Sequence, residues 1–544
     1  MSKRLSMTFL FLLLICPAAV ADEINKDILE AMTEHLACYP VELLDFKRQK
    51  PLLATKDICL STIYHETGGR PFWVTNNGPS KRAGVILGHL LNSFRDGLNP
   101  KDYEAATLQN LWYSREPRDL ARLDTLLTYN LVKYIHDLSY GQLKFLSSDP
   151  ELFAEAGNET FNPVAAIERA LAADEIGRYL DELPPQHHYY QSLRAALRHY
   201  RELAKKTGWE TIPAGALIRP GMPDDRLEAI QHNLIMLGVI ESSPESPQNY
   251  HPELVDSIVE FQKKRGLEPD GIIGANTIAA LNTPISELIM AIEVNLARWR
   301  WHAHNLGRNY IMVNIADFTL KAVRNDQVQL DMPVIVGKLQ HQTPVFSDTI
   351  RYLDFNPFWN VPPSIAMNEY LPELRKNPRH LVERHIRLFS SWSSDAVEID
   401  STSIDWQTIS RSQMARYKLR QDPGPWNALG SVKFVFPNHY SVYLHDTPAH
   451  DLFSQTSRSF SHGCIRVSKP LDLARFSLDE NGAEWSLERI EQIVALGERK
   501  ILRISPPLAV HVTYQTVWVD NERNIYFNSD IYGRDAKLIK VLVN

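Results

Sequence analysis

The sequence lacks an excess of positive charge and lacks a long apolar run. Its 544 residues hold 58 Lys and Arg against 65 Asp and Glu, which gives a formal net charge of −7 at pH 7. Neither a long basic run nor an aromatic and basic motif occurs, so we expect no nucleic-acid partner. After the first residues, no segment reaches the roughly eighteen apolar residues that a membrane-spanning helix needs. The hydrophobic content of 44% and charged content of 23% are ordinary for a globular protein.

The first residues have the layout of a secretory signal peptide. Lys3 and Arg4 precede the apolar residues 7–15, and residues 17–21 are mostly small and end before Asp22. This pattern predicts a signal peptide at residues 1–21, so we expect export to the periplasm. Nine apolar residues are few for a bilayer span, although an N-terminal anchor stays open as an alternative. Cys16 follows Leu-Leu-Ile and so lacks the small residue expected before a lipidated cysteine.

Cysteine is scarce, with 4 in the whole sequence and three after removal of the signal peptide. An odd number in an exported protein points to one disulfide and one free thiol. Cys38 and Cys59 lie twenty-one positions apart, whereas Cys464 is remote from both. We therefore expect a Cys38–Cys59 disulfide and a free Cys464 in an oxidising compartment. Two separately buried thiols at positions 38 and 59 are the alternative.

The length of 544 residues predicts three or four domains, and the spacing of apolar residues predicts a multidomain α+β protein. Residues 22–215 are mainly helical in pattern, as in the stripe formed by Leu127, Leu131, Tyr134 and Leu138, and predict a helical scaffold domain. The other predicted parts are a compact three-helix unit at 216–284, a connecting helix at 285–305, a β-rich domain at 306–510 with a charged, helix-compatible insertion at 366–422, and C-terminal strands with a tail at 511–544.

Within the β-rich part, twofold alternation predicts individual strands. We expect strands at 310–316, 319–323, 327–336, 432–436, 441–444, 501–504 and 513–519. Asn325 and Asp326 form a turn between the second and third of these. A turn at 437–440 places His445 at a strand end, and Ser468 and Pro470 open a helix after Cys464.

His445 and Cys464 stand nineteen positions apart and point to a thiol active site. A nucleophilic cysteine needs a base within hydrogen-bond reach and backbone N–H groups aimed at the developing oxyanion. Gly463 lets the chain bend sharply beside Cys464. This pattern leaves the base open between His445 and His462. It also leaves a zinc site open, formed by these three residues and His450, although their spacing matches none of the usual Cys/His frameworks.

The order His445, fifteen intervening residues, and then Ser-His-Gly-Cys-Ile-Arg at 461–466 resembles the L,D-transpeptidase (YkuD-type) signature. The resemblance implies that Cys464 is the nucleophile and that His445 is the base. It also implies that the backbone carbonyl of Asp446 orients the His445 imidazole.

The same resemblance implies roles for neighbouring residues. His462 and Gly463 would shape the pocket and the oxyanion site, and Arg466 would help to hold the substrate, as would Ser461. The segment 424–430 also resembles the L,D-transpeptidase catalytic domain, as do 332–338, 343–348 and 355–365, and it suggests Trp426 and Asn427 as further substrate-binding residues.

Other segments resemble additional domains of large, YcbB-type L,D-transpeptidases. Residues 70–73 and 96–103 resemble their N-terminal scaffold, and the insertion at 366–422 resembles their capping subdomain, with a peripheral insert as the alternative. Residues 261–281 resemble the peptidoglycan-binding domain of type 1, with a helical spacer as the alternative. Residues 530–535 resemble the family's C-terminal tail, for which the sequence suggests no mechanism.

The resemblance implies a cysteine-dependent acyltransferase of cell-wall biogenesis and cell shape, with no cofactor and no metal. Cys464 would form a thioester from a tetrapeptide donor stem of peptidoglycan, and a diaminopimelate acceptor would resolve it as a 3→3 cross-link. A β-lactam or carbapenem adduct at Cys464 and contacts with other cell-wall synthases are further implied partners. An L,D-carboxypeptidase with the same site and a non-catalytic peptidoglycan-binding protein with an inert pocket are the alternatives.

Overall fold

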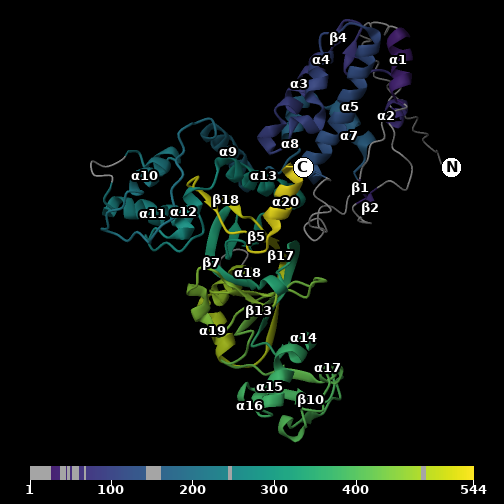
Figure 1. Cartoon of the computed structure of the whole chain (residues 1–544). Coiled ribbons are helices and arrows are strands. Elements are labelled where there is room, and N and C mark those ends of the chain that lie inside the picture. Colours follow the sequence, from purple (N-terminus) through teal and green to yellow (C-terminus); the bar gives the residue numbers. More distant parts are fainter. Residues whose placement is uncertain are drawn as a thin grey trace, which may run out of the picture. The chain divides into compact units, whose positions relative to one another are not determined.

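The computed structural model describes residues 26–36, 44–45, 50–51, 60–66, 69–142, 161–242, 248–478 and 485–543 (Figure 1). The chain divides into two compact units. The first comprises residues 1–94, 98–136 and 160–183, and the second comprises 95–97, 137–159 and 184–544. The predicted signal peptide at 1–21 and the predicted Cys38–Cys59 pair lie outside the described residues.

The first unit is mainly helical, as the apolar stripe predicted. Leu127, Leu131 and Tyr134 are fully buried along α5. The elements of this part of the chain are α1 (Lys26–Leu36), β1 (Leu44–Asp45), β2 (Lys50–Pro51), α2 (Leu60–Glu66), β3 (Val74–Thr75), β4 (Gly78–Pro79), α3 (Lys81–Leu91), η1 (Ser93–Asp96), η2 (Pro100–Tyr103), α4 (Ala105–Leu111), α5 (Pro117–Tyr140), α7 (Pro163–Ala172) and α8 (Ile176–Glu182).

A buried carboxylate joins α5 to the segment around β3. Asp124 accepts the backbone N–H of Trp73 at 2.6 Å and of Val74 at 3.1 Å. It also accepts the hydroxyl of Tyr64 at 2.6 Å. Burial raises the pKa of Asp124 to about 6, even though these hydrogen bonds lower it. Desolvation therefore outweighs the donors at this position.

The second unit contains the predicted three-helix part, formed by α10 (Leu227–Met236), α11 (Pro252–Lys264) and α12 (Ala275–Leu281). Its core joins apolar residues of all three helices, among them Leu234, Ile258 and Ile278. Gln262 is buried at the end of α11, where its Oε1 accepts the N–H of Gly271 at 2.9 Å and its Nε2 donates to the Ile272 carbonyl at 3.0 Å. One side chain thus fixes the turn that leads into α12.

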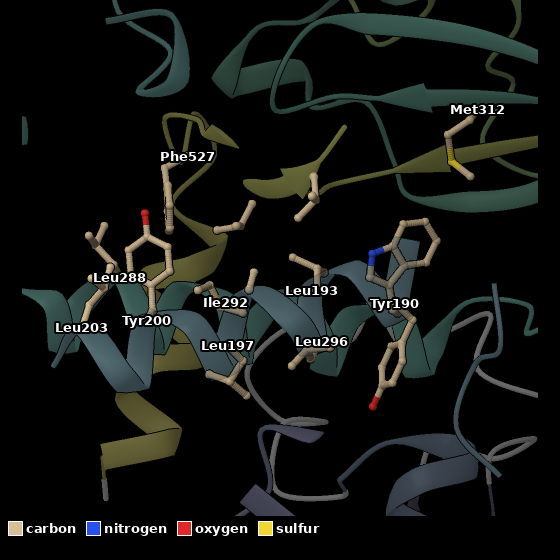
Figure 2. Close-up of a cluster of buried hydrophobic side chains, with 14 of the residues drawn as sticks. Tyr190, Leu193, Leu197, Tyr200, Leu203, Leu288, Ile292, Leu296, Met312 and Phe527 are labelled. Atoms are coloured by element: carbon tan, nitrogen blue, oxygen red, sulfur yellow. The ribbon is translucent and has the colours of Figure 1, made fainter. Parts of the chain in front are cut away.

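Two further helices pack against each other, α9 (His188–Leu203) and α13 (Ile285–Trp301). The connecting helix predicted at 285–305 is confirmed from Ile285 to Trp301, where it ends. Figure 2 shows the shared core, which includes Leu193 and Leu197 of α9, Ile292 and Leu296 of α13, and Phe527 from the C-terminal hairpin.

Among the described residues, no single helix is both long and apolar enough to cross a membrane. One bent pair, α12 with α13 at 84°, reaches that length and composition only when its two helices are taken together.

A nine-stranded mixed sheet forms the centre of the second unit, and it confirms the predicted β-rich part. The strand order is β15-β7-β16-β14-β13-β8-β17-β5-β6, and β6 also pairs with β7, so the sheet closes on itself. The strands are β5 (Asn309–Asn314), β6 (Thr319–Arg324), β7 (Gln327–Gly337), β8 (Phe346–Phe355), β13 (Val432–Val435), β14 (Leu444–His445), β15 (Ser459–Ser461), β16 (Ile465–Val467) and β17 (Lys500–Thr513).

The remaining elements of this part lie around the sheet. They are η4 (Leu339–His341), η7 (His450–Ser454), α18 (Pro470–Leu478), α19 (Leu487–Ala495), β18 (Val517–Val519), β19 (Ile525–Phe527) and α20 (Arg534–Val543). The turn predicted at Asn325 and Asp326 has φ angles of 52° and 61°, as a tight hairpin between β6 and β7 requires.

Two strand predictions need correction. The strand expected at 441–444 is shorter, because Asn438 donates to the carbonyls of Phe436 and Val442 at 2.7 Å each and so stabilises a longer loop before β14. The separate strands expected at 501–504 and 513–519 are instead the long β17 and the short β18. β17 also runs across the boundary predicted at residue 510.

The insertion contains a sheet that its helix-compatible sequence did not predict. Three strands of this sheet lie within residues 366–422, namely β10 (Ile386–Phe389), β11 (Glu398–Ile399) and β12 (Lys418–Gln421). The fourth, β9 (Trp359–Asn360), precedes residue 366, and the order is β11-β10-β12-β9. The helices are α14 (Pro363–Ile365), just before the predicted insertion, and then η5 (Ala366–Tyr370), α15 (Leu371–Lys376), α16 (His380–Glu383), η6 (Ser401–Ser403) and α17 (Arg411–Met414). Leu374, Leu388 and Trp406 belong to a core of its own.

Candidate active site

One row of paired residues across the sheet carries the chemistry. Lys433 on β13 pairs with His445 on β14, and His445 pairs with Arg466 on β16. Side chains alternate between the two faces of a strand, so residues two apart share a face. Tyr443 and Cys464 come just before β14 and β16, each two residues before a member of this row. The Tyr443 ring lies 5.6 Å from that of His445, and the Cys464 sulfur interacts with Tyr443, Lys433 and Arg466. The sheet brings four polar side chains and a thiol together.

His445 is buried and is held by one hydrogen bond. Its Nδ1 lies 2.5 Å from the backbone oxygen of Asp446. Because a carbonyl oxygen only accepts, Nδ1 carries the proton and Nε2 keeps its lone pair. Burial, together with the nearby charges of Arg466 and Lys433, lowers the pKa of His445 to about 3, although the hydrogen bond to Asp446 raises it. The imidazole is therefore neutral at pH 7, in the tautomer that a base at Nε2 requires.

The Asp446 side chain fixes this carbonyl in place. One carboxylate oxygen accepts the N–H and the hydroxyl of Ser431 at 2.8 Å and 2.7 Å, and the other accepts the N–H of Thr447 at 2.7 Å. Gly430 has a φ of +61°, and a Cβ there would lie 2.4 Å from the Asp446 carboxylate. Glycine is therefore required beside Asp446.

Cys464 is a half-buried free thiol. Its Sγ lies 3.9 Å from the carbonyl oxygen of Ser441. Burial raises the pKa of the thiol, whereas hydrogen bonds from the backbone and hydroxyl of Tyr443 and the charges of Lys433 and Arg466 lower it. The effect of burial on the pKa exceeds that of the hydrogen bonds and charges, so the resting sulfur is a neutral thiol that needs a base to remove its proton.

The sequence analysis missed Tyr443 and Lys433. The Lys433 ammonium lies 3.7 Å from the centre of the Tyr443 ring, and this ring lies 5.6 Å from that of His445. Burial lowers the pKa of Lys433, which the sulfur of Cys464 and the carboxylate of Asp354 raise. The signal that could have found Tyr443 is its position two residues before His445, which predicts a shared face.

The loop before Cys464 is fixed by its own hydrogen bonds. The Ser461 hydroxyl donates to the carbonyl of Cys464 at 2.5 Å and accepts the N–H of Gly463 at 3.1 Å. Gly463 has a φ of +109°, which L side chains rarely adopt. The Gly463 N–H is thus occupied, whereas among the described residues no acceptor pairs with the N–H of Cys464. Cys464 itself offers a free donor to an oxyanion.

The C-terminal tail, which the sequence left without a mechanism, reaches this loop through β7 and the segment after it. The Tyr532 hydroxyl donates to the Gly337 carbonyl at 2.6 Å and accepts the Thr343 N–H at 3.2 Å. The Thr343 hydroxyl in turn donates to the Gly463 carbonyl at 2.9 Å. Residues 532, 343 and 463 form a continuous chain of hydrogen bonds.

His462 meets the insertion. Its Nε2 contacts the carboxylate of Glu369 in η5, and its ring lies 4.9 Å from that of His341. The insertion therefore touches the residue that lies two positions before Cys464. This contact argues against a peripheral insert.

The two residues predicted from segment 424–430 have different surroundings. Trp426 is 43% exposed and stacks on His385 of the insertion, with ring centres 4.2 Å apart. Asn427 is fully buried, and its amide donates to the Pro357 carbonyl at 2.9 Å while its oxygen accepts the Leu429 N–H at 2.8 Å. Asn427 and the buried Ser461 thus hold loops, and their contact with a substrate stays a prediction.

Arg466 is the candidate for holding an anion. Its Nε is buried without a hydrogen-bond partner among the described residues. Burial lowers the pKa of Arg466. A buried donor without a partner favours a ligand that supplies an acceptor.

The zinc alternative involves His450, which is exposed and lies 3.8 Å from the Asp446 carboxylate. In the described part of the chain, no group of three or more His, Cys, Asp or Glu residues is placed to hold a metal ion.

Three family models match the chain. Residues 308–485 match the L,D-transpeptidase catalytic domain, residues 59–197 match a scaffold domain, and residues 223–281 match a "Putative peptidoglycan binding domain". The resemblances stated from the sequence are therefore confirmed over these three segments. The exact domain boundaries stay predictions.

Similar proteins carry the same description. A Haemophilus influenzae protein described as "Putative L,D-transpeptidase" is 33% identical over 236 residues, which are 43% of this chain and 46% of that protein. The chain thus spans less than half of this relative. An L,D-transpeptidase structure from Mycobacterium smegmatis matches 38% of this chain and 58% of its own at 12% identity, with a TM-score of 0.19. The structure of L,D-transpeptidase 3 from Mycobacterium tuberculosis with a faropenem-derived adduct matches 38% of this chain and 60% of its own chain. The identity is 13% and the TM-score is 0.18.

Proposed function

We propose that this protein is an exported, cysteine-dependent L,D-transpeptidase that forms 3→3 cross-links between peptidoglycan stem peptides in the periplasm. The observation that carries the proposal is a free Cys464 thiol two residues before Arg466, the register partner of a neutral His445 whose Nδ1 is held by the Asp446 carbonyl. Both residues lie in the segment that matches the catalytic-domain model. Export rests on the N-terminal sequence pattern.

In the first step, the Cys464 sulfur attacks the carbonyl carbon that joins the third residue of a tetrapeptide stem to its terminal D-alanine. Nε2 of His445 takes the thiol proton as the S–C bond forms. The N–H of Cys464, which has no acceptor among the described residues, is a donor available to the oxyanion. The C–N bond then breaks, His445 returns the proton to the D-alanine amine, and a thioester remains.

In the second step, the side-chain amine of a diaminopimelate on a neighbouring stem attacks the thioester. His445 takes a proton from this amine, a new C–N bond forms, and the C–S bond breaks. The sulfur is then protonated again. Water in place of the amine would release a tripeptide, so exclusion of water decides between transfer and hydrolysis. The contact of Glu369 with His462 supports a covering role for the insertion.

The same attack accounts for a β-lactam adduct. Opening of the lactam ring breaks a C–N bond inside one molecule, so no group leaves and the protein gains the whole mass of a carbapenem. Arg466 and Lys433 supply positive charge beside Cys464 for the carboxylate of a stem peptide or of a carbapenem.

The test is a product analysis. The purified protein is incubated with disaccharide-tetrapeptide, and the products are separated by mass spectrometry. We expect a dimer that has lost one D-alanine and is joined between two diaminopimelates. The Cys464→Ala variant should give neither thioester nor dimer while it unfolds at an unchanged temperature.

Other products would assign a different activity. Tripeptide monomer alone would identify an L,D-carboxypeptidase. Binding without turnover by folded wild-type protein would identify a peptidoglycan-binding protein. Turnover by the Cys464→Ala variant would remove Cys464 from the mechanism.

A further inference from the structure

A second cavity lies away from Cys464, where the three-helix part meets the C-terminal hairpin. Its volume is about 440 Å³. The end of α10, one face of α11, residues of α9 and the β18–β19 hairpin line it. Three of these elements belong to the second unit's helices, and none belongs to the strands that carry His445 or Arg466.

Arg265 stands out among the residues that line this cavity. Its guanidinium lies 5.2 Å from the ring centre of Phe261 and 4.8 Å from that of Phe527. Two aromatic rings thus fix its position, and Phe527 in turn packs on Tyr200 at 5.3 Å (Figure 2). Stacking of this kind presents the planar N–H groups of arginine in one orientation.

This guanidinium has no acceptor of its own. Among the described residues, no ion pair and no side-chain hydrogen bond involves Arg265. The neighbouring Lys264, by contrast, pairs with Glu260 at 3.3 Å. Arg265 is half-buried, and burial lowers the pKa of its guanidinium. A guanidinium that two aromatic rings orient and no carboxylate occupies keeps its planar N–H groups available to a ligand that supplies an acceptor.

The same cavity also carries negative charge. Asp256 and Glu260 line it from successive turns of α11. Asp256 is exposed and has no ion pair in the described part of the chain. At a rise of about 1.5 Å per residue, nine positions separate the Asp256 and Arg265 backbones by about 13 Å. This separation exceeds the span of a single amino acid and corresponds to a short peptide of about four extended residues.

We propose that this cavity binds a short peptide through its free C-terminal carboxylate, with Arg265 as the anchor. The carboxylate accepts two parallel N–H donors from the guanidinium, and an ammonium group of the peptide faces Asp256. The proposal rests on the proposed function for one point, the identification of this peptide as a peptidoglycan stem. Residues 237–265 of the lining lie within the segment that matches the peptidoglycan-binding model, whereas Phe527 and Arg523 come from outside it.

Hydrogen exchange read by mass spectrometry tests the proposal on the full chain with Cys464→Ala, which prevents turnover. The probe is disaccharide-tetrapeptide with a free terminal carboxylate. We expect protection of peptides that cover residues 252–266 and 523–527. An amidated terminus should weaken this protection at least tenfold, and the disaccharide without peptide should give none.

Protein variants provide the matched controls. Arg265→Gln should weaken protection by the probe about as much as amidation of the probe does. Arg265→Lys should recover only part of this protection, because an ammonium group lacks the two parallel N–H donors of a guanidinium. Arg219→Gln removes an exposed charge from the same helical part and should change nothing. If the Arg265 variants unfold, the amidated probe still decides the question on the unchanged protein.

The outcomes separate this proposal from the proposed function. Equal protection by the free and amidated probes, or protection by the disaccharide alone, overturns the carboxylate anchor. Protection confined to residues 441–466 also overturns it, while leaving the active site intact. Protection at 252–266 without any at 441–466 would uphold the cavity and count against the proposed function.

Discussion

At the scale of single residues, the site combines a neutral base with a neutral thiol. Burial and two nearby cations lower the pKa of His445 to about 3. Burial raises the pKa of Cys464 in spite of the same two cations. The resting site therefore contains no thiolate–imidazolium pair. The thiol proton moves from Cys464 to His445 only when the sulfur attacks.

Lys433→Gln tests this balance. Loss of the ammonium should raise the pKa of Cys464 further, since Lys433 lowers it. Asp354 keeps its two 2.8 Å hydrogen bonds to Arg499, so the variant leaves no unpaired carboxylate. Alkylation of Cys464 by iodoacetamide, measured from pH 6 to 10 by mass spectrometry, should shift to higher pH and be several-fold slower near pH 7.

The matched control is Lys469→Gln, because Lys469 is an exposed cation two residues after β16, and its ammonium donates to the Asp331 carbonyl on β7. Its alkylation profile should superimpose on that of the wild type. A Lys433→Gln profile that also superimposes would show that the ammonium does not act on the sulfur.

At the scale of secondary-structure elements, local patterns predicted α10, α11, α12 and α13 and the hairpin of β6 and β7. α13 and the turn at Asn325 and Asp326 follow from short-range periodicity and from residues that tolerate positive φ. The insertion's sheet could not be predicted, because its two- to four-residue strands are too short to show alternation. Its pairing of β9 with β12 joins residues about sixty positions apart.

Some active-site residues could likewise be predicted from local sequence and others could not. Cys464, Gly463 and His445 follow from a sequence motif. Lys433 and Tyr532 do not, because each reaches the site through strand register or a hydrogen bond between distant segments. Such contacts depend on tertiary structure, which a pattern in one stretch of sequence does not carry.

Replacement of residues 361–419 by Asn-Gly tests the insertion. Asn360 and Arg420 are register partners on β9 and β12, so a two-residue hairpin can join them. The insertion has its own core, so its loss should leave the nine-stranded sheet folded. We expect slower formation of dimer and a larger share of tripeptide, measured by mass spectrometry on disaccharide-tetrapeptide.

Glu369→Gln in the intact chain is the milder companion variant. Its pair with His462 is partly exposed, and such pairs contribute at most about 1 kcal/mol. Its product ratio should therefore change less than about fivefold. An unchanged product ratio after removal of the whole insertion would contradict a covering role.

At the scale of the whole molecule, each of the two units has its own buried polar groups and its own response to pH. The first unit buries Asp124, whose pKa is raised to about 6 from an ordinary value near 3.8. Between these two values the folded unit holds more protons than the unfolded chain. Its stability should therefore fall as the pH rises from about 4 to about 6, by at most about 3 kcal/mol.

Asp124→Asn should remove this slope and lower the stability of the first unit at every pH, since an amide cannot accept all the bonds that Asp124 accepts. The measurement is hydrogen exchange of the Trp73 and Val74 amides from pH 4 to 7. Asp119→Asn, on the same helix, is the control and should keep the slope. A slope that survives in Asp124→Asn would assign it to other groups.

The hydrogen bonds of Tyr532 tie the reactive loop to a segment that follows the sheet in the sequence. Every strand of the nine-stranded sheet ends by residue 513, so the sheet contains all of its strands without residues 530–535. Support for Gly463 through Thr343 comes from Tyr532, outside the sheet. A chain interrupted after β17 would keep every strand that carries Cys464, His445 and Arg466, and would still present Cys464 in a loop without that support. A nick or truncation far from the cysteine in sequence would therefore reach it through two hydrogen bonds.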